Sequence, residues 1–464
     1  MKIAVLAESL DGERRVSATP ETVGKFGKLG ASVAVEAGAG RGAAIPDEAF
    51  AAAGAAVSDR AGALRGAGAI LCVRGPEPDR LAGAAQGALL IGILDPYRRA
   101  DAVRGYAAAG LTAVAMEWVP RITRAQGMDV LSSQANLAGY KAVLDAAAEY
   151  GRAFPMMMTA AGTVSAARVF VMGVGVAGLQ AIATARRLGA QVSATDVRSA
   201  TREQIQSLGA KPVFVENVAG IEGEGQGGYA GETSEEYRRA QAELVSAHIA
   251  KQDIVITTAL IPGRAAPRLV SDAQIASMKP GAWVVAVLNP FGAGNDGRAR
   301  VDAYAAAGLE ALAMEWMPRI TRAQSMDVLS SQSNLAGYKA VLDAAAEYGR
   351  AFPMMMTAAG TVSAARVFVM GVGVAGLQAI ATARRLGAVV SATDVRSATR
   401  EQILSLGAKP IFVEGVAGIE GEGAGGYAGE TSPEYRQAQA ELVSSHLAKQ
   451  DIVVTTALIQ GRPA

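Results

Sequence analysis

Residues 167–196 read ARVFVMGVGVAGLQAIATARRLGAQVSATD, and the architecture of the chain can be built outward from them. The apolar run Val169–Met172 predicts a strand, and three glycines in the spacing G-x-G-x-x-G follow it directly. A helical segment comes next and ends at Gly189, where glycine suits a left-handed C-cap. A second strand closes at Asp196, 23 residues after Gly173 (196 − 173). This order of strand, turn, helix, strand and acidic residue predicts a Rossmann-type dinucleotide site.

Each position of this motif has a mechanical reason. Gly173 permits the sharp turn, Gly175 lets the backbone approach a pyrophosphate, and Gly178 lets the helix pack on the strand. The N-terminus of the helix then faces the phosphates. The Asp196 carboxylate accepts hydrogen bonds from ribose hydroxyls and repels a 2′-phosphate, which favours NAD(H) as the ligand. The alternative interpretation is a glycine turn that serves packing alone.

The composition limits the class of protein. A chain of 464 residues, 50% hydrophobic and 19% charged, is long enough for two to four globular domains. Its formal net charge of +1 gives no indication of nucleic-acid binding. The single cysteine, Cys72, cannot form an internal disulfide and stands in an apolar run, so we interpret it as a core residue. The sequence has neither the pattern of a signal peptide nor an apolar run of about 18 residues, and we expect no membrane-spanning segment.

The first 112 residues alternate short strands and helices, which predicts an α/β domain with a parallel sheet. One helix is predicted over 19–29, between a proline near its start and a glycine at its end. The glycine-containing loop 37–42 lacks the following Lys-Ser/Thr of a P-loop, so we interpret it as a turn. The predicted strands of this domain are 2–6, 32–36, 69–73, 88–94 and 112–116.

A connecting segment leads from this domain to the glycine motif. Apolar spacing predicts a helix over 131–147, with Ser132 or Ser133 as its N-cap. The triplet Met156–Met158 is interpreted as a buried interdomain hinge. The nucleotide domain continues with predicted strands at 253–259 and 282–288, and the glycine-rich stretch 218–230 is interpreted as a mobile flap.

The sequence also repeats itself. Shifting the chain by 198 residues superimposes 115–264 on 313–462 with about 14 mismatches in about 150 positions. We interpret this as a tandem duplication whose second copy is truncated after its fourth predicted strand, 451–457. The predicted domains are 1–135, an N-terminal α/β domain with the start of the connecting helix; 136–288, the first Rossmann domain; 289–350, a repeated strand and connecting helix; and 351–464, the second Rossmann domain.

Seven motifs together resemble a known family: DGERRVSATP at 11–20, PRITRAQ at 120–126, MDVLSS at 128–133, NLAGY at 136–140, FPMMMTAAGT at 154–163, GVGVAG at 173–178 and TTALIPG at 257–263. The chain resembles the alanine dehydrogenase/transhydrogenase family, and within it the NAD(H)-binding component of proton-translocating transhydrogenases. The resemblance covers residues 1–285 and again 281–464. One departure is Gly127, where the family has a serine that the second copy retains as Ser325.

The resemblance implies the residues of two nucleotide sites and no metal site. In the first copy, Gln126, Asp129 and Ser132 would position the nicotinamide. The other residues implied for cofactor binding in this copy are Arg121, Gly173, Gly175, Val176, Ala177, Gly178, Asp196, Val197, Arg198, Tyr229, Ala259 and Leu260. The second copy offers Arg319, Gln324, Asp327, Ser330, Gly371, Gly373, Gly376, Asp394, Arg396 and Tyr427.

The resemblance also implies an activity and its partners. NADH bound here would donate a hydride to NADP⁺ on a separate subunit, with membrane-spanning and NADP(H)-binding partner subunits, a homodimer, and a cytoplasmic location peripheral to the inner membrane. Direct hydride transfer needs positioning and exclusion of water, and no acid or base. An alanine-dehydrogenase-like enzyme is the alternative, but its family members use a histidine and a lysine, and the positions near Arg74 and Asp95 carry neither. A duplicated nucleotide-binding relic without turnover is the third hypothesis.

Overall fold

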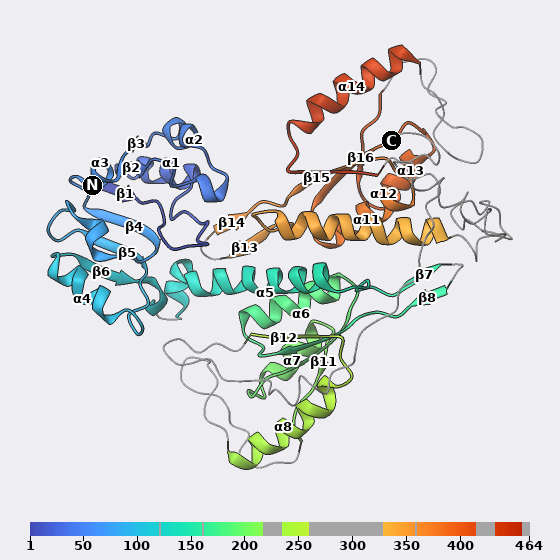
Figure 1. Ribbon diagram of the computed structural model, residues 1–464, viewed down its shortest axis with the longest axis horizontal. Coiled ribbons are helices and arrows are strands. Elements are labelled where there is room, and N and C mark those ends of the chain that lie inside the picture. Colours follow the sequence, from blue (N-terminus) through green and yellow to red (C-terminus); the bar gives the residue numbers. More distant parts are fainter. Residues whose placement is uncertain are drawn as a thin grey trace, which may run out of the picture. The chain divides into compact units, whose positions relative to one another are not determined.

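The computed structural model describes residues 1–119, 122–159, 162–216, 234–258, 328–357, 360–413 and 432–456 (Figure 1). The chain divides into two compact units, one built mainly from Met1–Gln134 and the other mainly from the residues after it. Within the described part of the chain, no helix is both long and apolar enough to cross a membrane.

The N-terminal unit contains a parallel six-stranded sheet in the order β3-β2-β1-β4-β5-β6. The strands are β1 (Lys2–Val5), β2 (Ser32–Glu36), β3 (Ala56–Ser58), β4 (Ala69–Arg74), β5 (Leu89–Ile93) and β6 (Thr112–Ala115). The helices are α1 (Pro20–Lys28), α2 (Asp47–Ala52), α3 (Arg60–Leu64) and α4 (Ala100–Ala108). All five strands predicted for this domain are present, and β3 was missed because it has only three residues.

Successive residues of β1 enter different cores of this unit. Ala4 belongs to a cluster with Leu64 of α3 and Tyr106 of α4, whereas Val5 belongs to one with Val23 of α1 and Phe50 of α2. Side chains of a strand alternate between its two faces, so both faces of the sheet are covered by helices. The predicted α/β class with a parallel sheet is confirmed.

The second unit contains a parallel sheet around the glycine motif, in the order β11-β10-β9-β12. Its elements in chain order are α5 (Val130–Glu149, which begins in the first unit), β7 (Met157–Thr159), β8 (Gly162–Val164), β9 (Arg168–Met172), α6 (Val176–Arg187), β10 (Gln191–Thr195), α7 (Thr201–Ser207), β11 (Lys211–Pro212), α8 (Glu235–Ile249) and β12 (Ile254–Thr257). This is the order of the first four strands of a Rossmann domain, 3-2-1-4. The predicted strand 282–288 and the flap 218–230 lie outside the described residues.

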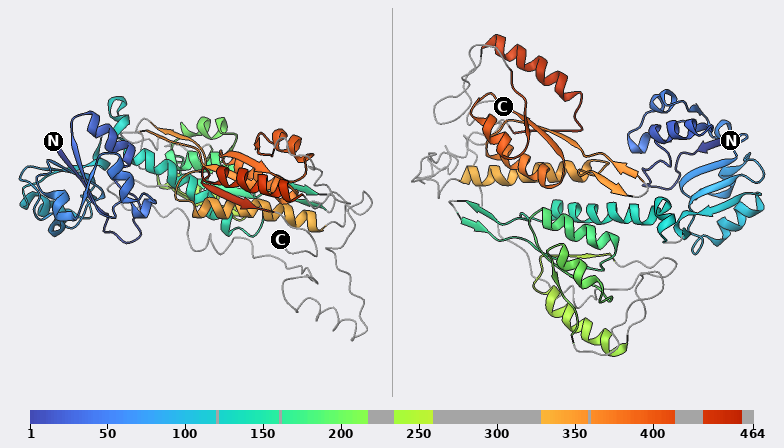
Figure 2. Two further views of the ribbon diagram at one scale, coloured as in Figure 1. Left: turned by 90° about the horizontal axis from the view of Figure 1, so that it is seen from above. Right: turned by 180° about the vertical axis from the view of Figure 1, so that it is seen from behind.

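The same unit contains a second sheet, coloured orange to red in Figure 2. Its strands have the same order, β17-β16-β15-β18. Its elements are α11 (Val328–Glu347), β13 (Met355–Thr357), β14 (Gly360–Val362), β15 (Arg366–Met370), α12 (Val374–Arg385), β16 (Val389–Thr393), α13 (Thr399–Ser405), β17 (Lys409–Pro410), α14 (Pro433–Leu447) and β18 (Ile452–Thr455). The buried side chains of α5, α6, α11 and α12 belong to one continuous hydrophobic cluster.

The interpretation of the methionine triplet as a buried hinge was wrong. Met157 begins the short antiparallel hairpin β7–β8, in which it pairs with Val164. Met157 is buried, whereas Met156 and Met158 are 53% and 74% exposed. Neighbouring residues of an extended strand point to opposite faces, so one buried methionine leaves its two neighbours in solvent.

Candidate nucleotide-binding site

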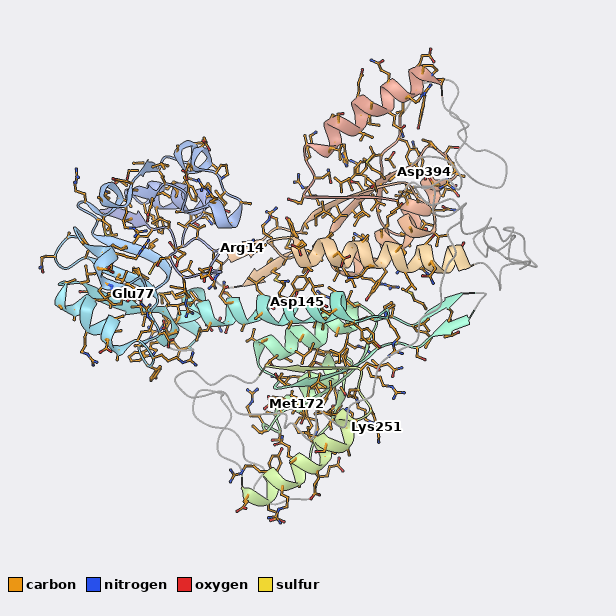
Figure 3. The ribbon with its side chains drawn as sticks, in the orientation of Figure 1. Arg14, Glu77, Asp145, Met172, Lys251 and Asp394 are labelled. Atoms are coloured by element: carbon orange, nitrogen blue, oxygen red, sulfur yellow. The ribbon has the colours of Figure 1, made fainter. Side chains whose placement is uncertain are left out.

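The three glycines of the motif form a tight loop at the carboxyl end of β9, directly after Met172 (Figure 3). Gly173 has φ +95°, a backbone conformation that side chains rarely adopt. A Cβ placed on Gly178 would lie 1.9 Å from the Gly173 carbonyl oxygen, so only glycine permits this packing of α6 on the strand end. A Cβ placed on Gly175 would meet no atom within 4 Å, which leaves its backbone open to a ligand. The environments of Gly173 and Gly178 match their predicted roles in the turn and in helix packing, while the approach of a pyrophosphate to Gly175 stays a prediction.

Helix α6 begins at Val176, immediately after this loop. In the described part of the chain no side chain caps its N-terminus, where Gly175 is the N-cap residue. The first N–H groups of a helix lack intrahelical partners and carry a partial positive charge. The loop and the helix terminus therefore present backbone donors suited to a pyrophosphate.

Asp196 follows β10, the strand beside β9, and it is 93% buried against the same loop. Its Oδ2 accepts a hydrogen bond from the Val174 N–H at 2.6 Å, and its Oδ1 accepts one from the Arg198 N–H at 2.9 Å. The Arg198 guanidinium donates twice more, from Nε to Oδ1 at 2.9 Å and from a terminal nitrogen to Oδ2 at 2.8 Å. Sequence reasoning placed Asp196 and Arg198 in the site, and the structure brings both to the glycine loop.

The Asp196 carboxylate is ionised in this environment. Burial acts to raise the pKa of Asp196, but the hydrogen bonds from Arg198 and from the Val174 N–H outweigh it and lower the pKa below its ordinary value. A carboxylate offers about four lone pairs, and these four donors use all of them. A ribose hydroxyl that bonds to Asp196 must therefore replace one guanidinium N–H.

The second copy repeats this arrangement at Asp394 (Figure 3). Asp394 accepts from the Val372 N–H at 2.6 Å and from Arg396 through the backbone N–H, Nε and a terminal nitrogen, each at 2.9 Å. Gly371 has φ +92°, and a Cβ on Gly376 would lie 1.9 Å from the Gly371 carbonyl oxygen. The two loops thus have the same geometry where the chain is described.

Asp129 and Ser132 lie together at the start of α5, in the other unit of the chain. The Asp129 carboxylate accepts from the Ser132 N–H at 2.9 Å and from the Ser132 hydroxyl at 2.6 Å. This is the geometry of an aspartate N-cap, so the expectation that Ser132 or Ser133 caps the helix was wrong. Gln126 is exposed in the short 3-10 helix Thr123–Met128, and the roles of these three residues in positioning a nicotinamide stay predictions.

Several predicted site residues lie outside the described residues: Arg121, Tyr229, Ala259, Leu260, Arg319, Gln324, Asp327 and Tyr427. Ser330 is described and lies in the first turn of α11. Val197 lies between Asp196 and Arg198, and Ala177 lies in the first turn of α6.

Two contacts that support the loop were missed from the sequence. The Thr258 hydroxyl, at the carboxyl end of β12, donates to the Gly173 carbonyl oxygen at 2.8 Å, and Thr456 does the same for Gly371 at 2.7 Å. A Cβ on Gly139 of α5 would lie 2.0 Å from the Ala177 carbonyl oxygen, so α5 touches the first turn of α6. The signal that could have found Thr258 was its place near the end of the predicted fourth strand, 253–259, which neighbours the first strand in this fold.

His248, one of the two histidines, has a packing role. Its ring lies 4.6 Å from the Phe170 ring, centroid to centroid, and Nε2 is 2.8 Å from the Ser193 hydroxyl. Burial, with Lys211 and Lys251 nearby, lowers the pKa of His248, so the ring is neutral near pH 7. Over the described residues, no group of three metal-ligating side chains converges.

Comparison with known proteins identifies related domains. The model described as the alanine dehydrogenase/PNT N-terminal domain matches residues 4–138, and that of the alanine dehydrogenase/PNT C-terminal domain matches residues 142–333 and 340–464.

Relatives come from both branches of these proteins. The first part of the NAD(P) transhydrogenase alpha subunit of Rhodospirillum rubrum is 52% identical over 291 residues, which cover 61% of this chain and 76% of that protein. A solved structure of transhydrogenase from Sinorhizobium meliloti is 57% identical with a TM-score of 0.56, over 61% of this chain and 76% of that chain. The alanine dehydrogenase of Halomonas elongata is 30% identical over 292 residues, 62% of this chain and 72% of that enzyme.

Proposed function

Because the chain belongs to the alanine dehydrogenase/PNT family, we propose that it is the NAD(H)-binding component of an NAD(P) transhydrogenase. The observation that carries this proposal is the glycine loop at the end of β9 with the ionised Asp196 beside it. We also propose four domains: 1–135, the N-terminal α/β domain; 136–288, the first Rossmann domain; 289–350, a repeated strand and connecting helix; and 351–464, the second Rossmann domain.

The residues present fit a dinucleotide without a 2′-phosphate. Gly175 leaves open space above the loop, and the first turn of α6 offers backbone donors for the pyrophosphate. Asp196, which is anionic, would bind ribose hydroxyls and repel a phosphate at the same position. The nicotinamide ring of NAD(H) supplies the hydride, and the protein supplies orientation and exclusion of water.

The second nucleotide, NADP(H), would be bound by a partner subunit. Transfer between two nicotinamide rings moves a hydride alone, so it needs no acid or base from this chain. Arg121, Gln126, Asp129 and Ser132 would orient the nicotinamide. Proton translocation would belong to membrane-spanning partner subunits, with this chain held at the cytoplasmic side of the inner membrane through them.

An alanine-dehydrogenase-like reaction is the second candidate, because an enzyme of that name is 30% identical over 292 residues. That chemistry also moves a proton at the substrate nitrogen or oxygen, and it needs an acid–base group. The positions near Arg74 and Asp95, where a lysine and a histidine are expected for that chemistry, carry neither. His248 packs against Phe170 and Ser193, so its contacts favour a structural role. These observations favour the transhydrogenase.

The proposal is tested by measuring binding and turnover separately. Titration with NADH, followed by nucleotide fluorescence, should show saturable binding, whereas NADPH should bind much more weakly. Addition of the partner subunits should then give NADPH-dependent reduction of an NAD analogue. NADH oxidation that depends on pyruvate and ammonium would instead establish the alanine-dehydrogenase reaction. Nucleotide binding without either reaction would support the third hypothesis, a duplicated nucleotide-binding protein that has no turnover.

A further inference from the structure

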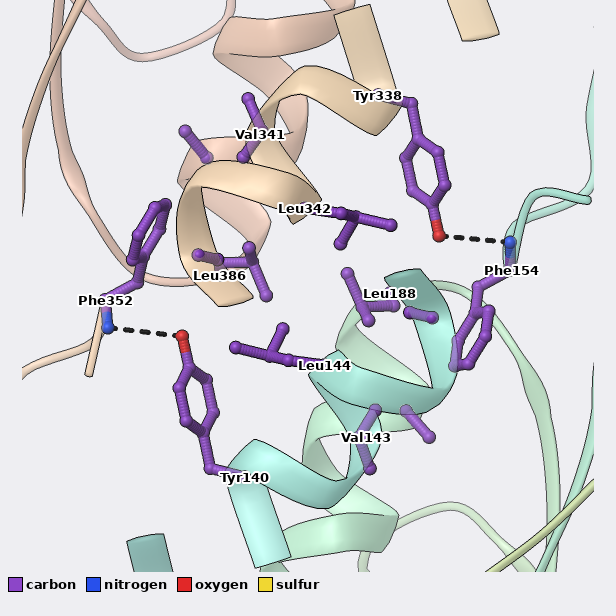
Figure 4. Close-up of a cluster of buried hydrophobic side chains, with 14 of the residues drawn as sticks. Tyr140, Val143, Leu144, Phe154, Leu188, Tyr338, Val341, Leu342, Phe352 and Leu386 are labelled. Carbon is purple, nitrogen blue, oxygen red and sulfur yellow. Dashed lines mark hydrogen bonds between the residues drawn. The ribbon is translucent and has the colours of Figure 1, made fainter. Parts of the chain in front are cut away.

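The two Rossmann-type halves of the second unit share a core made by equivalent surfaces (Figure 4). Leu144 of α5 and Leu188, just after α6, lie opposite Leu342 of α11 and Leu386, just after α12. All four side chains are at most 1% exposed. Residues 144 and 342, and likewise 188 and 386, are separated by the repeat of 198, so each half contributes the same surface.

Reciprocal hydrogen bonds cross this core (Figure 4). The Phe154 N–H donates to the Tyr338 hydroxyl at 3.1 Å, and the Phe352 N–H donates to the Tyr140 hydroxyl at 3.2 Å. Phe154 and Phe352 are equivalent positions of the repeat, and so are Tyr140 and Tyr338, so each half makes the same contact to the other. Reciprocal contacts of this kind define an isologous, two-fold interface. Such an interface normally joins two identical chains.

Charged contacts follow the same symmetry at the edge of the core. The Lys141 ammonium donates to the Ala346 carbonyl oxygen at 3.1 Å, and the Lys339 ammonium donates to the Ala148 carbonyl oxygen at 2.8 Å. The two lysines line one polar pocket of about 310 Å³ with acidic residues of both helices. An apolar centre with paired polar groups around it has the anatomy of a specific interface.

We propose that the second half, described over residues 328–357, 360–413 and 432–456, is a built-in partner subunit for the first Rossmann domain, occupying the surface that a second chain would otherwise cover. The pairing is intramolecular, so its effective concentration is set by the connection between the halves and not by the protein concentration. The homodimer expected from the sequence is thereby replaced by a pair within one chain.

The pairing also bears on the nucleotide site. The α5 helix carries Tyr140 and Leu144 in the interface, and one residue before Tyr140, Gly139 touches the Ala177 carbonyl oxygen in the first turn of α6. That turn presents the donors to the pyrophosphate. The second half therefore packs against α5, which in turn contacts α6 beside the glycine loop of the first half. This contact gives the second half a structural role that does not require it to bind nucleotide.

Cross-linking through engineered cysteines tests the proposal in the full chain. Lys141→Cys and Lys339→Cys place two thiols in the lining of one pocket, where bis-maleimide reagents of increasing spacer length can be tried in turn. The natural Cys72 is buried, and its pKa is raised to about 12, so it gives little background. The double variant should yield an intrachain bridge between peptides containing positions 141 and 339, with the mass of one chain.

The single variants are the matched controls. If two chains paired through the same surface, α5 would face α5 of the second chain, and Lys141→Cys alone would give a cross-linked product of doubled mass. We expect the single variants to stay at one chain mass, and sedimentation of the unmodified protein to give 47.3 kDa at every concentration. A doubled mass in the single variants, in the double variant or in sedimentation would overturn the proposal, as would a double variant without the intrachain bridge.

Discussion

The variant Asp196→Asn tests whether the first of the two glycine loops binds NADH, because it changes that loop alone. The carboxylate accepts four hydrogen bonds, from the Val174 N–H and from three Arg198 donors. An amide has one acceptor oxygen with two lone pairs, and its NH₂ group only donates. The variant therefore loses at least two of these four contacts and the negative charge that favours ribose over a 2′-phosphate.

The expected loss of affinity follows from the charge of the group. A hydrogen bond to a charged group contributes about 1.5–3 kcal/mol. Loss of one ribose contact of this kind weakens NADH binding roughly 10- to 150-fold, since about 1.4 kcal/mol corresponds to tenfold. The same change relaxes discrimination against NADPH, because the anion that repels its 2′-phosphate is gone.

Asp394→Asn is a control matched nearly atom for atom. Asp394 has the same four donors, from Val372 and Arg396, and is 92% buried against 93% for Asp196. Both variants should therefore lower the melting temperature by a similar amount. Only Asp196→Asn should weaken the NADH titration if NADH binds in the first copy alone.

Fluorescence titrations with NADH and NADPH, together with thermal unfolding, give all the required quantities. Equal NADH affinity in Asp196→Asn and the unmodified protein would refute the assignment of Asp196 to the ribose. A loss of equal size in both variants would show that NADH binds in both copies.

Three further outcomes are expected. Gly178→Ala should abolish nucleotide binding and lower the melting temperature, because its Cβ would lie 1.9 Å from the Gly173 carbonyl oxygen. Gly175→Ala, whose Cβ meets nothing within 4 Å, should keep the melting temperature of the unmodified protein and lose only NADH affinity. Equal melting temperatures for the two variants would contradict this. Burial raises the pKa of Tyr140 and Tyr338 to about 12, so their stabilisation of the paired halves is complete below pH of about 10 and is lost as pH rises through about 12. The yield of the 141–339 cross-link, measured after incubation at each pH, should fall as pH rises from about 10 to about 12. A Tyr140→Phe/Tyr338→Phe variant should not show this fall. Cys72 should resist thiol reagents at pH 8 until the protein unfolds, and rapid labelling of the native chain would show that its surroundings open.

The local parts of the fold were readable from the sequence. The apolar run of β9, the glycine spacing and Asp196 all lie within 30 residues, and each acts on its chain neighbours through backbone geometry. The strands of the N-terminal sheet other than β3 were likewise found from short apolar runs between turn residues. Fold class and the position of the glycine loop depend on such local rules, so one sequence was enough to predict them.

Contacts between distant residues became known only from the folded chain. Thr258 reaches Gly173 across 85 residues. Asp129 takes the capping role because α5 begins at Val130, ahead of both serines expected to cap it. Exposure of Met156 and Met158 depends on which face of a hairpin is covered, which an apolar triplet does not encode.

The pairing of the two halves is the clearest example of a contact that the sequence pattern did not predict. The copies are almost identical, so their patterns describe two equal surfaces without saying that these surfaces meet each other. Residue pattern was sufficient to specify the glycine loop, present twice, because that loop is built from neighbours in the chain. Tyr140 and Tyr338 each bond to the other half, and no pattern encodes this, because only folding brings residues about 200 positions apart into contact.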